Sequence, residues 1–342
     1  MAELTRPLAE LRQADAAQFG GKSATLGELI AADIPVPPGF ALSTDAFRLF
    51  VSEAGLEGVI ASSMARVSPG DVDAVNAASQ AIGEAMRSAS VPAPVRDEVA
   101  RRYQTLADAA VAVRSSALGE DSQEATFAGQ QETYLWIRGV DHICDAVRDC
   151  WISLYSAPAI SYRARLGDAA EKPAMGVTIQ LMVDAEVSGV MFTCNPVSGD
   201  PSMVAINASW GLGLAVVGGE VTPDDYLVSK VTRELVREQV STKTVEYVPA
   251  EGGAVSVAVP DERRDQSCLD EPALAALVDV GKRVEKYFGS RQDIEWARSR
   301  DGELFVVQSR PVTGLAKPEQ TEAKPSSAMS LLMSTFGANK EQ

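Results

Sequence analysis

Hydrophobic and polar residues alternate along both halves of residues 293–312, DIEWARSRDGELFVVQSRPV. Asp301-Gly302 separates the halves and is a strong signal for a β-hairpin with a two-residue turn, which would place Arg300 opposite Glu303. Side chains alternate between the faces of a strand, so the predicted core face consists of Ile294, Trp296, Phe305 and Val307. The predicted polar face consists of Asp293 opposite Arg310 and Glu295 opposite Gln308.

The polar face of this hairpin suggests a binding site. Directly opposed side chains lie about 5 Å apart, so the Glu295 carboxylate and the Gln308 amide would offer two hard oxygen ligands suited to Mg²⁺. Arg310 would add a fixed cation whose forked geometry grips phosphate. The pattern alone leaves an alternative open, in which the face is solvated and Asp293 and Arg310 form only a surface ion pair.

The rest of the chain predicts a mixture of helices and strands. Helical spacing of apolar residues covers much of residues 43–110, 141–166 and 270–288. Short strand patterns occur at residues 111–117, 132–137, 175–183, 187–193 and within 229–265. A chain of 342 residues can form two packed units or one large domain. We therefore expect an α/β or α+β protein.

Lys22 is a candidate phosphate contact. It follows two glycines in FGGKSATLGELI and precedes helical spacing. Glycine lets a backbone approach a ligand closely, and a helix N-terminus favours anions. The stretch is not a P-loop, because GxxxxGK(S/T) requires glycine where Ala16 stands and no strand precedes it. A helix start with an exposed lysine is the alternative.

A small-residue loop follows the strand that carries Arg114. The loop, GEDSQEATFAGQQ, contains Gly119 and Gly129 and leads into a strand that carries Thr133. A loop of this kind with an arginine at its base suits a mobile cover over phosphates. A plain surface hairpin is the alternative.

Two further segments bear on nucleotide binding. In the strand at 175–183, Gln180 and Met182 point to the same side, and the end of such a strand can contact the edge of adenine. A buried hairpin is the alternative. Residues 208–228 are rich in glycine, but Val216 occupies the third glycine position of a dinucleotide fingerprint, which excludes that motif.

Charge limits the partners of the protein. Formal net charge is −16 with a pI near 4.6, which argues against a nucleic-acid or anionic-membrane surface, since phosphate backbones require a basic footprint. A polyphosphate nucleotide could still bind in a local cationic pocket with Mg²⁺.

Cysteine usage and the N-terminal sequence predict a cytoplasmic protein. No CxxC pair and no zinc-type spacing occurs, so we expect reduced thiols at Cys144, Cys150, Cys194 and Cys268. The N-terminal residues lack the apolar core of a signal peptide, and no apolar run approaches the 18 residues of a membrane span. The single histidine, His142, has no adjacent nucleophile or metal partner and is expected to be structural or exposed.

Together the segments resemble the N-terminal nucleotide-binding module of the phosphoenolpyruvate synthase and pyruvate, phosphate dikinase family, which includes rifampin phosphotransferase. The resemblance covers roughly residues 11–315. Its motifs are FGGKSATLGEL, AVRSSALGEDS, FAGQQETYL, IQLMV, VSGVMFTCNP, ASWGLG, VTPDDY, DIEWA and VVQSRPV. The resemblance implies an α/β (α+β) ATP-grasp fold, in which two lobes enclose a nucleotide cleft.

The resemblance also implies roles for single residues. Phosphate contacts correspond to Lys22, Arg114, Gly129, Thr133 and Arg310. The adenine hinge corresponds to Gln180 and Met182, and the Mg²⁺ positions to Glu295 and Gln308. Lys22, Arg114 and Arg310 would be the catalytic residues, and ATP and Mg²⁺ the cofactors. Departures from the family pattern are Ser23, where glycine is usual, and Leu214, where glutamate often follows GLG.

A histidine-bearing domain with a TSGG-like motif is typical of such dikinases, and the sequence lacks that motif. We therefore expect an ATP-binding catalytic subunit of a split dikinase, which transfers a phosphoryl group to a histidine on a partner subunit and releases AMP and phosphate. Phenylphosphate synthase resembles this arrangement, so phenol is the first candidate for the final acceptor. The alternatives are a regulatory module without turnover, favoured by Leu214, and an ATP-binding domain excised from a longer enzyme.

The expected division of the chain has three parts. Residues 1–186 would form the N-terminal lobe, and residues 187–315 the C-terminal lobe. Residues 316–342, which begin with AKPEQTEAKPSS, have the composition of a linker.

Overall fold

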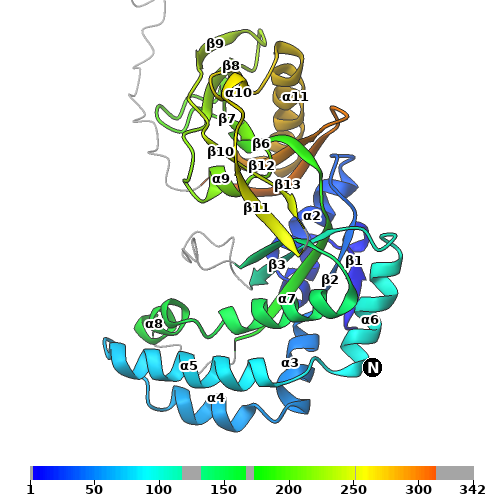
Figure 1. Ribbon diagram of the computed structural model, residues 1–342, viewed down its shortest axis with the longest axis vertical. Coiled ribbons are helices and arrows are strands. Elements are labelled where there is room, and N and C mark those ends of the chain that lie inside the picture. The colour runs from blue at the N-terminus through cyan, green and yellow to red at the C-terminus, as the bar shows by residue number, and fades with distance from the viewer. Residues whose placement is uncertain (1–2, 118–131, 167–172, 251, 313–342) are drawn as a thin grey trace, which may run out of the picture.

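The computed structural model describes residues 3–117, 132–166, 173–250 and 252–312. Two sheets form the centres of two lobes, which lie one above the other in Figure 1. The sheet of the lower lobe has the strand order β1 (Thr5–Pro7), β2 (Gly39–Leu42), β5 (Met175–Leu181), β3 (Val111–Ala117), β4 (Thr133–Ile137). Its neighbouring strands are all antiparallel.

Helices pack around the sheet of the lower lobe. They are α3 (Thr44–Glu53), α4 (Glu57–Met64), α5 (Val72–Ser88), α6 (Ala93–Gln104), α7 (Val140–Ser153) and α8 (Ala157–Leu166). Their apolar residues share one core with the strands. Trp151 of α7 belongs to this core and is fully buried, and its ring stacks on Phe50 of α3 with centroids 5.1 Å apart. The helices predicted from the spacing of apolar residues are thus present. They cover one face of the sheet, and the other face is directed toward the upper lobe.

The sheet of the upper lobe is also antiparallel. Its strand order is β13 (Leu304–Pro311), β12 (Gln292–Ser299), β6 (Ala185–Phe192), β7 (Met203–Trp210), β8 (Asp224–Ser229), β9 (Leu235–Gln239). Helix α11 (Glu271–Phe288) packs on it and buries Leu274, Leu277 and Val284 at helical spacing. The Asp270 side chain caps the start of this helix, and Gly289 ends it in a left-handed conformation.

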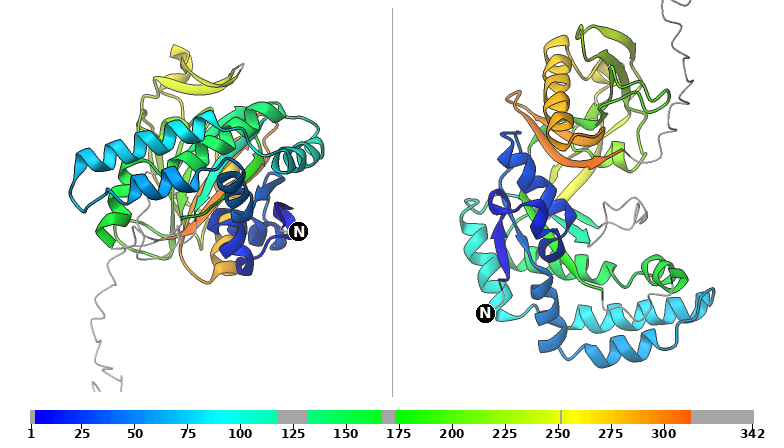
Figure 2. Two further views of the ribbon diagram at one scale, coloured as in Figure 1. Left: turned by 90° about the horizontal axis from the view of Figure 1, so that it is seen from below. Right: turned by 180° about the vertical axis from the view of Figure 1, so that it is seen from behind.

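The N-terminal segment contributes to the core of the upper lobe. Leu26 and Leu29 of helix α2 (Gly21–Ala31) share a core with α11 and Val306 of β13. Figure 2 shows the dark blue helices between the orange hairpin and the lower lobe. Residues near the N-terminus thus contribute to the core of the upper lobe. The division at residue 186 remains a prediction, and the predicted linker at residues 316–342 lies outside the described residues.

The remaining elements are short. A hairpin of β10 (Val245–Ala250) and β11 (Gly253–Ala258) extends from the upper lobe toward the lower one (Figure 1). The others are α1 (Ala16–Phe19), α9 (Leu214–Val217), α10 (Asp261–Arg264) and the 3₁₀ helices Leu8–Glu10 and Gln13–Asp15. Within the described part of the chain, every helix is too short or too polar to cross a bilayer.

The β12–β13 hairpin departs from prediction at its turn. Ser299 and not Arg300 pairs with Glu303, so the turn comprises residues 300–302 and Gly302 has a φ of +83°. A β-bulge between Glu295 and Trp296 then shifts the register by one residue, because Val307 has no Cα partner on β12. The two departures cancel, so Glu295 faces Gln308 and Asp293 faces Arg310 as predicted.

The bulge also changes which residues enter the core. Ile294 and Trp296 are buried in the core of the upper lobe, as predicted. Val306 joins them there instead of Phe305 and Val307, and Val307 faces the other side of the sheet. The prediction that Phe305 and Val307 form the core face is therefore wrong.

Candidate functional site

A cavity of about 390 Å³ lies between the two sheets. This volume is within the range of small-ligand sites. Its walls come from β3, β4 and the end of β5 in the lower lobe, and from β6, α9 and the β12–β13 hairpin in the upper lobe. Most of the residues predicted to contact a nucleotide line it: Arg114, Thr133, Gln180, Met182, Glu295, Gln308 and Arg310. Gly129 lies outside the described residues.

The side chain of Arg114 extends from β3 in the lower lobe and contacts the β12–β13 hairpin of the upper lobe. Its Nη2 donates to Glu295 Oε2 at 2.9 Å and to Gln308 Oε1 at 2.8 Å, and its Nη1 donates to the Val307 carbonyl oxygen at 2.8 Å. Val307 is the bulge residue, whose carbonyl is available because the residue has no partner in the ladder. The side chain of Arg114 is 11% exposed. One buried guanidinium thus joins the two lobes at the polar end of the cavity.

Lys22 lies beside the same polar end. Together with Arg114 and Gln308 it lines a small cavity adjacent to the main one. It is the second residue of α2, only 6% exposed, and its Nζ donates to the Ser115 carbonyl oxygen at 3.0 Å. The alternative of an exposed lysine at a helix start is therefore wrong.

The glycine before this helix permits the close approach of α2 to β3. Gly20 has a φ of +85°, and a Cβ on it would lie 2.2 Å from the Ser116 carbonyl oxygen. Ser23, one of the departures from the family pattern, is fully buried, and its Oγ hydrogen bonds with Thr178 Oγ1 at 2.7 Å. It supports the packing of α2 on β5.

Arg310 and Asp293 form the ion pair that the sequence left as an alternative, with Arg310 Nε 2.9 Å from Asp293 Oδ2. The arginine is half exposed and lines the cavity, whereas the aspartate is largely buried. Burial raises the pKa of the Asp293 carboxyl, and Arg310 opposes that rise. The ion pair and a place for Arg310 in the cavity are therefore compatible.

The other end of the cavity is apolar. Gln180 at the end of β5 is buried, and its side-chain amide donates to the Pro37 carbonyl oxygen at 3.3 Å. The neighbouring lining residues have no charge: Met182, Val183, Ala185, Leu212, Leu214, Val217 and Ala297. Leu214, the second departure from the family pattern, thus forms part of the wall. Sequence reasoning missed most of the others, because apolar residues on strands give no signal that distinguishes a cavity wall from a core.

The donor set at the polar end can be tested against Mg²⁺. Glu295 Oε2 and Gln308 Oε1 both lie within 2.9 Å of one nitrogen, so the two oxygens converge on a single point, as ligands of one cation must. A carboxylate and an amide are hard oxygen donors, and Mg²⁺ commonly completes its shell with water and substrate phosphates. Among the described residues no group of three or more His, Cys, Asp or Glu side chains could hold a metal. The pair therefore fits a metal that arrives with additional ligands.

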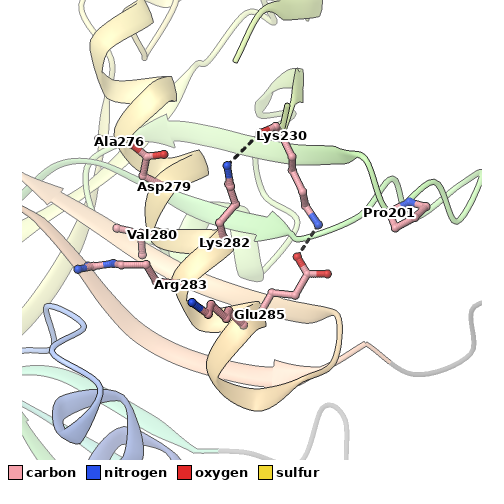
Figure 3. A pocket seen from close by; sticks show the side chains of 9 residues that line it. Pro201, Lys230, Ala276, Asp279, Val280, Lys282, Arg283 and Glu285 are labelled. Atoms are coloured by element: carbon pink, nitrogen blue, oxygen red, sulfur yellow. Dashed lines mark hydrogen bonds and ion pairs between the residues drawn. The ribbon is translucent and has the colours of Figure 1, made fainter. Parts of the chain in front are cut away.

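A larger open groove of about 1020 Å³ lies beside α11, away from these residues. Figure 3 shows Lys230 between Glu285 and the end of Lys282. Lys230 Nζ lies 2.5 Å from Glu285 Oε2, and Lys282 Nζ donates to the Lys230 carbonyl oxygen at 3.1 Å. Asp279 pairs with Arg233 at 2.9 Å. The carboxylates of the groove are thus compensated by neighbouring cations, and we assign it a structural role.

His142 and the cysteines lie outside the cavity. His142 is exposed in the first turn of α7, and its Nδ1 is 2.9 Å from the Arg138 carbonyl oxygen. The four cysteines are buried and form no disulfide. Burial raises the pKa of the Cys144 thiol to about 11, which makes it a poor nucleophile.

Comparison with known proteins identifies the family to which the chain is similar. Residues 16–330 match the family described as pyruvate phosphate dikinase, AMP/ATP-binding domain. The chain is 40% identical over 337 residues to a probable phosphoenolpyruvate synthase of Methanothermobacter thermautotrophicus, covering 96% of this chain and 48% of that protein. It is 37% identical over 378 residues to the phosphoenolpyruvate synthase of Pyrococcus furiosus, covering 96% and 46%. The chain thus spans about half the length of these relatives.

Similarity to solved structures is weaker. D-alanyl-alanine synthetase A from Vibrio cholerae is 10% identical, with 87% of this chain and 56% of that chain covered and a TM-score of 0.33. The α+β architecture of two lobes around a cavity, taken with the family match, is the ATP-grasp fold that the sequence predicts.

Proposed function

The chain belongs to the family of pyruvate phosphate dikinase AMP/ATP-binding domains, and from this we propose that it binds ATP with Mg²⁺ and transfers one phosphoryl group to a histidine of a partner subunit. A water molecule takes up the second phosphoryl group, so that AMP and phosphate leave. Phenol is our first candidate for the final acceptor. The site for this reaction would be the cavity between the two lobes.

One observation carries the proposal, namely the division of the cavity into a polar and an apolar end. Lys22, Arg114 and Arg310 lie at or beside the polar end, where they would neutralise the phosphates. Glu295 and Gln308 lie at the same end and would hold Mg²⁺. Gln180 and Met182 lie at the apolar end and would contact adenine, while Thr133 and the loop around Gly129 would cover the phosphates.

Positioning and electrostatics would supply the catalysis. Phosphoryl transfer needs its phosphates held in line with the acceptor and the developing charge neutralised, with little covalent chemistry from the protein. The metal, when bound, would neutralise phosphate charge. Arginine can hold a phosphate through two parallel hydrogen bonds, so Arg114 and Arg310 would orient the phosphates, and Lys22 would contribute a point charge.

The test is incubation of the chain with Mg·ATP and a protein that carries a histidine in a TSGG-like motif, followed by separation of the nucleotides. We expect AMP, phosphate and an acid-labile phosphohistidine, all lost in the Glu295→Gln variant. Glu303→Gln is the matched control, because Glu303 is exposed at the tip of the same hairpin and does not line the cavity. ADP as the sole nucleotide product would contradict the proposal.

Two observations support alternative functions. The relatives are about twice as long, which favours an ATP-binding domain of a longer phosphoenolpyruvate synthase-like enzyme; transfer to pyruvate through an attached histidine domain would support it. Leu214 in the cavity wall favours a regulatory module, which would bind ATP but form no AMP with any histidine-bearing partner.

A further inference from the structure

The two oxygens that would hold a metal are already occupied by a cation. Nη2 of Arg114 donates to both Glu295 Oε2 and Gln308 Oε1, at 2.9 and 2.8 Å. A metal bound between these oxygens would compete with the guanidinium nitrogen for the same place. Two cations so close together repel each other strongly in a partly buried site. Arg114 and a metal therefore cannot use this pair of oxygens at the same time.

The guanidinium of Arg114 also has one donor that is not hydrogen bonded to any residue that the structure describes. Its Nε is buried and has no hydrogen-bond partner among the described residues. A buried donor without a partner costs free energy, and a phosphate bound in a forked geometry could take up Nε together with one Nη. A phosphate could thus satisfy the one donor of Arg114 that its present partners leave unpaired.

We propose that Arg114 is a placeholder cation: in the absence of nucleotide its guanidinium occupies the metal position between Glu295 and Gln308, and it moves to the nucleotide phosphates when they bind. Phosphates that arrive with a metal would accept hydrogen bonds from the guanidinium, and Glu295 Oε2 and Gln308 Oε1 would then be free to hold the metal. The net charge around Glu295 stays compensated throughout, which avoids the cost of an unpaired carboxylate in a partly buried site.

Two consequences follow for the site. Without nucleotide, a divalent cation binds weakly, because it must displace a guanidinium that makes three hydrogen bonds across the cavity. With nucleotide, the contact between β3 and the β12–β13 hairpin is released and is replaced by contacts through the ligand. Metal binding and the contact between the lobes are thus coupled through one side chain. This inference deepens the function proposed above and rests on it for the identity of the phosphates.

The experiment measures Mn²⁺ binding to the whole chain by electron paramagnetic resonance, first without nucleotide. Mn²⁺ prefers the same hard oxygen ligands as Mg²⁺. We expect Arg114→Gln to bind Mn²⁺ at least about tenfold more tightly than the wild type, which corresponds to about 1.4 kcal/mol. Adding Glu295→Gln to that variant should remove the gain. Arg300→Gln is the control, because Arg300 is exposed on the same hairpin and pairs with Asp184, and it should leave Mn²⁺ binding unchanged.

Arg114→Lys provides a second variant in case Arg114→Gln does not fold. Lysine keeps the positive charge but loses the forked donor geometry, so Arg114→Lys should bind Mn²⁺ more tightly than the wild type, by less than about tenfold. Equal Mn²⁺ affinity in the wild type and both Arg114 variants would overturn the placeholder role. A gain in Arg300→Gln as large as in Arg114→Gln would do the same.

A parallel measurement separates this inference from the proposed function. ATP binding is followed by calorimetry with and without Mn²⁺. If ATP does not bind while Arg114→Gln still gains Mn²⁺ affinity, the proposed function is wrong and the exclusion of metal by Arg114 stands. If ATP binds but the wild type takes up Mn²⁺ alone as tightly as it does with ATP, the coupling is wrong and the ATP site stands.

Discussion

The carbonyl oxygen of Val307 accepts a hydrogen bond from Arg114 Nη1 at 2.8 Å across the cavity between the lobes. Val307 is available for this contact because a β-bulge removes it from the ladder with β12. The same bulge restores the register that a three-residue turn had shifted, so that Glu295 faces Gln308. One irregularity in a hairpin thus aligns two candidate metal ligands and frees a carbonyl for the other lobe.

Replacement of Gln308 by alanine should weaken the Mg²⁺-dependent part of ATP binding. Loss of an outer-sphere partner of a metal typically costs roughly 10–100-fold in affinity, so loss of a direct ligand should cost at least as much. Calorimetric titration of ATP with and without Mg²⁺ measures the effect. Glu303→Ala at the hairpin tip is the control, and an unchanged Mg²⁺ dependence in Gln308→Ala would exclude this residue as a ligand.

The two adjacent aspartates of VTPDDY should differ sharply in their effect on stability. Asp224 is fully buried, lies 2.6 Å from Lys243 Nζ and accepts from the backbone nitrogens of Ser241 and Cys268. Asp225 forms an ion pair with Arg237 at the surface.

Asp224→Ala would leave the Lys243 charge buried without compensation, so it should lower the free energy of unfolding by about 3–5 kcal/mol. Asp225→Ala should cost about 0–1 kcal/mol. Urea denaturation measures both. Similar values for the two variants would mean that the buried pair does not organise this part of the upper lobe.

The contact between α2 and α11 should depend on pH. Tyr287 donates a hydrogen bond to the Glu28 carboxylate, and this bond, followed by one from the Gln13 backbone nitrogen, lowers the pKa of Glu28 below its ordinary value of 4.5. A carboxyl whose pKa is lowered by folding contributes stability above its unfolded pKa, and loses that contribution as the pH falls through its folded pKa.

Tyr287→Phe should therefore destabilise the protein at neutral pH, and the difference from the wild type should shrink as the pH falls below 4.5. Unfolding free energies over this range measure it. In a Glu28→Gln background the effect of Tyr287→Phe should no longer change with pH, and a pH dependence that persisted there would assign the effect to another group.

Gly189 should tolerate no side chain. It lies on β6 in the wall of the cavity, and a Cβ there would lie 1.8 Å from the Asn207 carbonyl oxygen. Gly189→Ala should lower the free energy of unfolding by about 1–3 kcal/mol, the usual cost of overpacking.

Gly58 in α4 is the matched control, because a Cβ on it would meet nothing within 4 Å beyond its chain neighbours and the backbone of its own helix. Gly58→Ala should stabilise the protein by about 0.4–1 kcal/mol, since alanine restricts the unfolded chain. Denaturation midpoints of Gly189→Ala and Gly58→Ala measure both effects. Equal changes in stability would mean that β6 and β7 can move apart enough to accommodate a methyl group at Gly189.

The sequence by itself determined the features that depend on neighbours along the chain. Alternation of polar and apolar residues placed Glu295, Gln308, Asp293 and Arg310 correctly, and helical spacing predicted α11. These features follow from side-chain periodicity, which is local. Even here the turn length was wrong, because Asp301-Gly302 fits a three-residue turn with Gly302 in the left-handed region as well as it fits a two-residue turn.

Only the tertiary structure decided which distant residues meet. Arg114 and Glu295 are 181 positions apart, and their contact depends on how two sheets pack, which no local pattern encodes. The burial of Lys22, the place of α2 in the core of the upper lobe and the apolar wall at Leu214 were settled in the same way. Packing brings together surfaces whose partners lie elsewhere in the chain, whereas periodicity reports only which side of an element is apolar.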